Sequence, residues 1–135
     1  MVLSGRVERA VRADTLDQAR AVAARMLERA NRLVVQEWID GADSDIYFTL
    51  FTCDSKSRAA MFSGRKLVCD PPAVGNTAIC VAAPEAADEL GWLSKQFIAR
   101  TGYKGIGSLE FKRDRKSGKF IIVEPTVGQI GRAHV

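Results

Sequence analysis

Two glutamates in the last third of the sequence have a spacing that could bring their carboxylates together. Lys116-Ser117-Gly118 has the composition of a three-residue hairpin loop, with glycine in the left-handed position. If these residues form the loop, Arg115 pairs with Lys119, and counting back along both strands places Glu110 directly opposite Glu124. Directly opposed side chains have Cβ atoms about 5 Å apart, so two like charges there destabilise the sheet unless a positive charge neutralises them.

A divalent cation would neutralise such a carboxylate pair. Magnesium takes one or two carboxylates from a protein and fills its octahedral shell with water and phosphate oxygens. Thr126 lies two residues after Glu124, and Lys112 two residues after Glu110, so each shares a face with its glutamate, where Lys112 could meet a phosphate. The alternative is a solvated face on which the glutamates pair with neighbouring bases. Apolar residues flank both glutamates and indicate covered strands, in which a carboxylate needs a partner.

The composition limits the class of protein. The 135 residues, 47% hydrophobic and 27% charged, fit one soluble domain, and no apolar run approaches the roughly 20 residues that cross a bilayer. Three cysteines without a Cys-x-x-Cys pair argue against a disulfide framework and a thiolate zinc site, so a cytoplasmic location is expected. The net charge of +4 is compatible with an anionic ligand but does not demand nucleic acid.

The single histidine, His134, lies in the last six residues, 130–135. This hexapeptide resembles one reading frame of a sequencing-library adapter, and we expect it to be a non-native tail. The rest of the chain has no histidine, which excludes Ser-His-Asp triads, Cys-His pairs and histidine-ligated metals.

Hydrophobic periodicity and turn residues predict an α+β chain. One apolar stripe predicts a helix over 14–31 with the acidic start signal Asp14 and Asp17, and a second predicts a helix over 84–101 closed by Gly102. Runs of β-branched and aromatic residues predict the strands. These strands cover 33–39, 46–52, 59–62, 65–69, 77–82, 105–113 and 119–125.

Four short motifs, in this order, resemble those of the ATP-grasp superfamily, and most of all its carboxylate–amine ligase-like members. The motifs are Val35-Gln36-Glu37-Trp38-Ile39-Asp40-Gly41, Gly64-Arg65-Lys66-Leu67, Gly105-Ile106-Gly107-Ser108-Leu109-Glu110-Phe111-Lys112 and Val123-Glu124-Pro125-Thr126-Val127-Gly128. The resemblance covers about residues 8–129 and implies two α+β subdomains that grip ATP between them. It predicts an ATP-grasp-like antiparallel sheet with two packed helices, truncated at both ends.

The resemblance also implies a division of the chain. Residues 1–37 would be a remnant of the small subdomain, with a helix over 14–31 and a strand over 33–37. Residues 38–129 would be the large subdomain with the metal-binding hairpin, and 130–135 the tail. The lysines and glycine-rich loop that hold the phosphates in this family would lie upstream, so we expect the chain to be an inactive fragment.

The resemblance assigns roles to individual residues. Glu110 and Glu124 match the two magnesium-binding acids, and Thr126 stands where most of the superfamily has asparagine. The region of Arg65 and Lys66 lies near the phosphates and the acceptor carboxylate in relatives. The hinge between the subdomains, which meets adenine, matches Gln36, Glu37, Trp38 and Ile39. The acidic residue that meets the ribose hydroxyls matches Asp43, and Asp45 is the alternative candidate.

The function implied is ATP- and magnesium-dependent activation of a small-molecule carboxylate as an acyl phosphate, which an amine then attacks. ATP, magnesium, a carboxylate and an amine are the expected partners, and neither a membrane nor nucleic acid is expected. The alternative is a non-catalytic basic α+β module that binds RNA or another polyanion on an aromatic strand face formed by Tyr47, Phe48 and Phe51.

Overall fold

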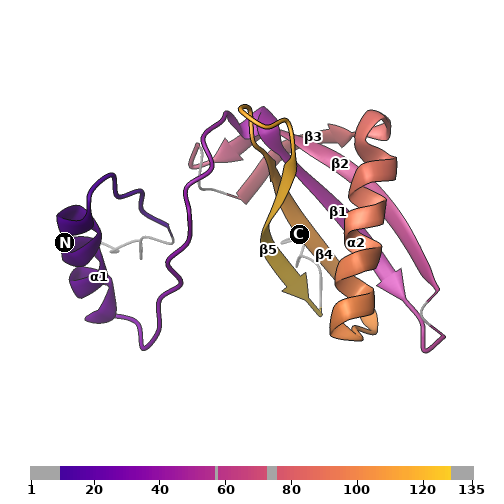
Figure 1. Cartoon of the computed structure of the whole chain (residues 1–135), viewed down its shortest axis with the longest axis horizontal. Coiled ribbons are helices and arrows are strands. Elements are labelled where there is room, and N and C mark those ends of the chain that lie inside the picture. The colour runs from indigo at the N-terminus through magenta and orange to yellow at the C-terminus, as the bar shows by residue number, and fades with distance from the viewer. Residues whose placement is uncertain (1–9, 57, 73–75, 129–135) are drawn as a thin grey trace, which may run out of the picture. The chain divides into compact units, whose positions relative to one another are not determined.

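The computed structural model describes residues 10–56, 58–72 and 76–128, and the chain divides into two compact units, Met1–Trp38 and Ile39–Val135. The described part of the first unit holds one helix, α1 (Leu16–Leu27). The second unit holds the sheet and the second long helix, α2 (Ala87–Thr101), as Figure 1 shows. No described helix is long and apolar enough to span a membrane.

Helix α1 confirms the first predicted helix but is shorter than expected. It starts after Thr15, whose hydroxyl accepts a hydrogen bond from the Gln18 N–H at 3.2 Å. The side-chain oxygen of Gln18 accepts a second hydrogen bond, from the Asp14 N–H at 2.9 Å. Thr15 is therefore the N-cap, one residue later than the acidic start signal indicated. None of the residues of α1 is buried.

The predicted strand at 33–39 is wrong. This segment has no regular secondary structure, and the side chains of Val34 and Val35 are 88% and 83% exposed. A strand is stabilised by the ladder hydrogen bonds of a neighbour, and no described strand pairs with this segment. The apolar pattern alone therefore does not make a strand here.

The second unit contains a five-stranded sheet in the order β3-β2-β1-β4-β5, in which every neighbouring pair is antiparallel. With α2 it forms the α+β arrangement that the sequence predicts. The strands predicted at 59–62 and 65–69 are one continuous 12-residue strand. The strands are β1 (Ile46–Cys53), β2 (Ala59–Asp70), β3 (Asn76–Ala82), β4 (Gly105–Arg113) and β5 (Phe120–Val127).

Helix α2 covers one face of this sheet, as Figure 1 shows, and the core lies between them. The helix follows a 3-10 turn, Pro84–Ala86, and ends at Gly102, whose φ of 65° is the left-handed cap that the sequence predicts. Alternate residues of β1 and β4 face the helix. The buried core includes Tyr47, Phe51, Leu90, Ile98, Leu109 and Phe111.

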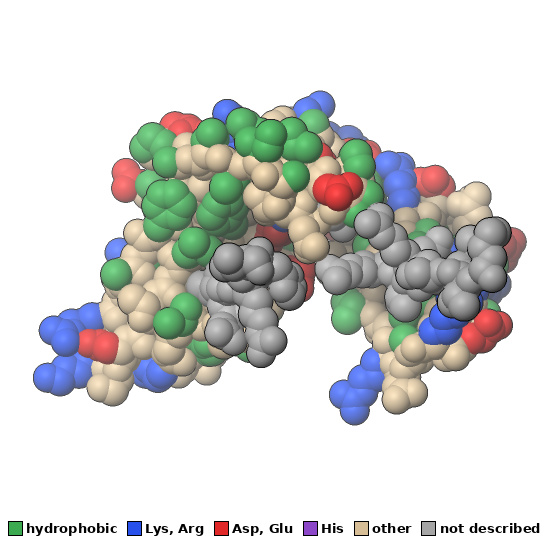
Figure 2. Space-filling view, turned by 180° about the vertical axis from the view of Figure 1, so that it is seen from behind, with side chains coloured by type: hydrophobic (Ala, Val, Ile, Leu, Met, Phe, Trp, Pro, Cys, Tyr) green, Lys and Arg blue, Asp and Glu red, His purple; other side chains and the backbone are tan. Residues whose placement is uncertain are grey.

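The other residues of the same strands form the opposite face, which we call the open face. On β1 these include Phe48 and Leu50, whose cross-strand partners on β4 are Glu110 and Ser108. Two apolar side chains on the open face, Phe62 and Ile106, are 49% and 56% exposed. Figure 2, seen from behind, shows hydrophobic side chains gathered on the surface of this unit.

The hairpin of β4 and β5 differs from the predicted register next to its turn. The last ladder pair is Arg113 with Phe120, and the turn is closed by the Asp114 N–H bonded to the Lys119 carbonyl at 2.9 Å. An irregularity then leaves Val123 without a partner on β4. This bulge shifts the ladder by one residue.

Because of this one-residue shift, one of the two predicted cross-strand pairs forms and the other does not. Beyond the bulge, Glu110 lies opposite Glu124, as the sequence predicts. The predicted pair Arg115–Lys119 does not form, because both residues belong to the turn. The predicted turn is therefore too short, and the extra residue in the bulge restores the predicted pairing of Glu110 with Glu124.

The core contact of α2 can be tested by truncation. Leu90 is fully buried, so Leu90→Ala should lower the free energy of unfolding by about 2–5 kcal/mol, measured by urea denaturation. Leu16, which is 65% exposed on α1, provides the same chemical change without the burial. Leu16→Ala should cost less than about 0.5 kcal/mol, and equal losses in the two variants would contradict the packing described here.

Candidate functional site

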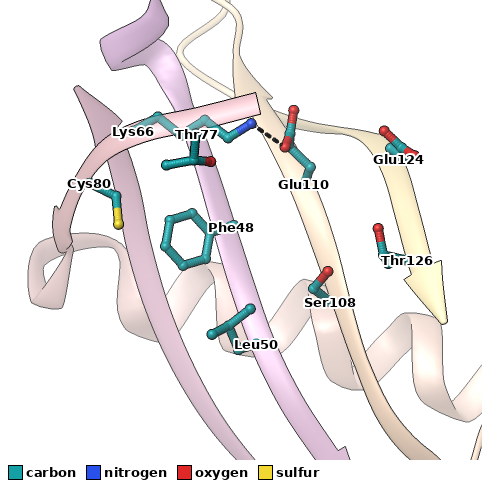
Figure 3. A pocket seen from close by; sticks show the side chains of 9 residues that line it. All are labelled: Phe48, Leu50, Lys66, Thr77, Cys80, Ser108, Glu110, Glu124 and Thr126. Carbon is teal, nitrogen blue, oxygen red and sulfur yellow. Dashed lines mark ion pairs between the residues drawn. The ribbon is translucent and has the colours of Figure 1, made fainter. Parts of the chain in front are cut away.

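A shallow pocket of about 260 Å³ lies on the open face of the sheet. Its polar side chains come from β2, β3, β4 and β5, and its apolar wall from β1, as Figure 3 shows. It is lined by Phe48, Leu50, Lys66, Thr77, Cys80, Ser108, Glu110, Glu124 and Thr126. Four residues that the sequence singled out, Lys66, Glu110, Glu124 and Thr126, are therefore brought together.

The two glutamates form the acidic side of the pocket. Glu110 on β4 lies directly opposite Glu124 on β5, and the next pair on this face is Ser108 opposite Thr126. Two carboxylates and two hydroxyls are oxygen donors, the class of ligand that magnesium takes. The described residues contain no group of three or more Asp, Glu, His or Cys that could hold a metal ion. A cation here would therefore complete its shell with water or ligand oxygens, as magnesium does at nucleotide sites.

Lys66 provides the positive charge of the pocket. Its Nζ lies 2.5 Å from Oε2 of Glu110, an ion pair drawn as the dashed line in Figure 3. Lys66 belongs to β2 and Glu110 to β4, so the lysine side chain crosses β1, which lies between them. The residue is only 5% exposed, which means that its ammonium is largely removed from water. The pair thus neutralises one of the two opposed carboxylates.

Arg65 does not line this pocket, and the role that the resemblance implies for it near the phosphates stays a prediction. Consecutive residues of a strand point to opposite faces, so Arg65 faces α2 when Lys66 faces the pocket. Its guanidinium carbon lies 5.9 Å from the centre of the Tyr47 ring, its cross-strand partner. Arg65 therefore contacts the core side of the sheet.

Lys112 does not line the pocket either. The side chain is buried, and its Nζ donates hydrogen bonds to the carbonyls of Gly41 at 3.1 Å and Ala42 at 2.9 Å. Burial lowers the pKa of Lys112, and the nearby carboxylates of Asp45 and Asp43 oppose that shift. The ammonium thus fastens the segment before β1, and a contact of Lys112 with a phosphate stays a prediction.

The two candidates for the ribose hydroxyls are both bonded within the protein. Asp43 accepts a hydrogen bond from the N–H of Cys69 at 2.8 Å. Asp45 accepts from the Ala42 N–H and from Arg115 Nε, each at 2.7 Å. Neither aspartate lines the pocket. A ribose contact by Asp43 stays a prediction.

The segment expected to meet adenine belongs to two units. Gln36, Glu37 and Trp38 are exposed residues of the first unit, and the ring of Trp38 lies 5.3 Å from the guanidinium carbon of Arg12. Ile39 opens the second unit. The adenine contact stays a prediction.

Sequence reasoning gave no role to four lining residues, Leu50, Thr77, Cys80 and Ser108, and it considered Phe48 only as part of an aromatic strand face. Ser108 could have been found, because the register that pairs Glu110 with Glu124 also pairs Ser108 with Thr126. Phe48 lies over Gly64, where a Cβ would stand 2.3 Å from the ring. A larger residue at position 64 would displace that ring from the pocket wall. Thr77 and Cys80 come from β3, and nothing in their local sequence connects them with the hairpin.

The aromatic strand face proposed for RNA binding is not present. Tyr47 and Phe51 are 4% and 3% exposed and belong to the core under α2. Phe48 alone of the three faces the pocket, since strand alternation separates it from its neighbours. The stacking surface that this alternative needs is therefore buried.

The clamp made by Lys112 yields a stability prediction. Lys112→Met should lower the free energy of unfolding by about 1–3 kcal/mol, because two carbonyls lose a charged donor. Lys116→Met, at an exposed lysine in the turn, should change it by less than about 0.5 kcal/mol in the same urea titration. A Lys112 variant as stable as the wild type would show that the clamp contributes nothing.

Comparisons with known proteins support the fold alone. No protein-family model and no curated protein matches the sequence. Among solved structures, the chain is similar to a complete multifunctional pyruvate carboxylase from Rhizobium etli, with 19% sequence identity and a TM-score of 0.51. The match covers 66% of this chain and 9% of that chain. At this identity the similarity supports the α+β fold of the matched part alone.

Proposed function

We propose that the second unit is the ATP- and magnesium-binding part of an ATP-grasp ligase, which activates a carboxylate as an acyl phosphate for attack by an amine. The observation that carries this proposal is the cross-strand pair Glu110–Glu124 in one pocket with the buried Lys66. The four sequence motifs and the fold likeness to a part of a carboxylase support it.

The residues of the pocket suit the charge balance of phosphoryl transfer. Glu110 and Glu124 would hold magnesium, with the hydroxyl of Thr126 beside Glu124 as a further neutral oxygen. MgATP would supply the phosphoryl group that activates the carboxylate. Lys66 places a positive charge in a largely dry position, where electrostatic stabilisation of developing negative charge is stronger than in water.

The apolar wall of the pocket contributes to the same chemistry. Phe48 and Leu50 line it from β1, next to the charged residues of β4. Apolar walls exclude water, which strengthens the charge interactions and protects an acyl phosphate from hydrolysis. No histidine is needed, because positioning and charge neutralisation carry this type of reaction.

This proposal predicts magnesium-dependent ATP binding by the full chain. Calorimetry should show weak ATP binding that strengthens when magnesium is added. Glu124→Gln should remove most of that magnesium dependence, because it takes away the glutamate that no described residue neutralises by an ion pair. We expect a loss of affinity of about tenfold in the presence of magnesium, on the scale of 1.4 kcal/mol.

Glu89→Gln is the matched control, since Glu89 is an exposed residue of the first turn of α2 and does not line the pocket. It should bind MgATP as the wild type does. Equal ATP affinity with and without magnesium would contradict the proposal, and so would tighter binding of RNA than of ATP.

A further inference from the structure

The carboxylate of Glu110 already has a cationic partner. The Nζ of Lys66 lies 2.5 Å from its Oε2, and the lysine is among the few buried charged residues of the described chain. Glu124, directly opposite, is exposed and forms no ion pair with any residue that the structure describes. Lys66 thus neutralises Glu110, and the carboxylate of Glu124 is exposed to solvent.

Charge and geometry make Lys66 a competitor of a metal ion. A magnesium ligand oxygen lies about 2.1 Å from the ion, so an ion bound to Oε2 of Glu110 would occupy the space in front of that oxygen. An ammonium at hydrogen-bond distance from the same oxygen would then face a divalent cation at short range. Two positive charges in a poorly solvated position repel strongly, so the two groups cannot share Oε2 of Glu110.

We propose that Lys66 is a resident counter-ion of Glu110 that magnesium must displace, so that cation binding releases the Lys66 ammonium to a phosphate. This inference rests on the proposed function. Lysine suits the exchange, because its compact ammonium sits on a flexible four-carbon stem and can change partner by rotamer changes alone. Magnesium binding and the release of the Lys66 ammonium for a phosphate then occur in the same step.

The exchange makes cation binding depend on the nucleotide. Without ATP, displacement leaves the Lys66 ammonium buried without a negative partner, which is costly. With ATP, a phosphate can take the place of the carboxylate, and that cost disappears. The site therefore favours magnesium with ATP over free magnesium, and by linkage magnesium raises the affinity for ATP by the same factor.

The decisive variant is Lys66→Met, which keeps the length of the side chain and removes the charge. The full chain is titrated with Mn²⁺ alone, which takes the same oxygen ligands as Mg²⁺ and is followed by electron paramagnetic resonance. We expect Lys66→Met to bind Mn²⁺ about tenfold more tightly than the wild type, a factor within the usual range of coupling between sites. A residue that merely supported the fold would lower the affinity when removed.

Two controls separate the local charge from general effects. Lys66→Arg keeps the charge and should not gain affinity for Mn²⁺. Lys95→Met removes one positive charge from an exposed position on α2, which covers the other face of the sheet, and should bind Mn²⁺ as the wild type does. If Lys66→Met does not fold, Lys66→Gln keeps a hydrogen-bond donor for Glu110 and should show the same gain.

A second titration adds ATP. In the wild type, ATP should raise the affinity for Mn²⁺, and in Lys66→Met and Lys66→Gln this gain should shrink at least about fivefold, because no ammonium is left to release. If the wild type binds MgATP but the neutral Lys66 variants bind Mn²⁺ no more tightly than it does, the counter-ion exchange is overturned and the proposed function stands. If the wild type binds no Mn²⁺ even with ATP, the proposed function itself fails.

Discussion

The like-charge pair Glu110–Glu124 constrains the rest of this unit. Two carboxylates at directly opposed sheet positions repel, so the fold must bring a positive charge to them. That charge comes from Lys66 on β2, two strands away from Glu110. In this sheet β1 lies between β2 and β4, so the lysine side chain crosses β1 on the open face to reach Glu110. The ion pair therefore forms only when these three strands are assembled.

Helix α2 makes this arrangement possible by covering the other face. Tyr47, Phe51 and Phe111 point toward the helix, and their burial supplies the apolar core. The alternate residues of the same strands are thereby free to be polar, and Glu110 lies between the buried Leu109 and Phe111. The core and the candidate site are thus two sides of one sheet, and a shift of register by one residue would exchange them.

Much of the second unit could be predicted from the sequence. Helix 84–101, its glycine cap and the strand at 105–113 depend on local patterns, and the structure has them at or near the predicted bounds. The Glu110–Glu124 pair was also predicted, although the turn is larger than assumed and the bulge at Val123 cancels the difference. The strand at 33–39 was wrong, since a strand needs a neighbour that no local pattern specifies.

By itself, the sequence determined which residues could do chemistry. The residues that the structure describes include no histidine, and their carboxylates and lysines suit a cation and an anion. Only the tertiary structure decided which of them meet. All three of Lys66, Arg65 and Lys112 are cationic. In the structure Lys66 is paired with Glu110, Arg65 lies over the ring of Tyr47, and Lys112 is bonded to backbone carbonyls. Strand alternation and the order of strands decide this difference. The strand order comes from long-range pairing, because residues far apart in the chain become neighbours only when the sheet has formed.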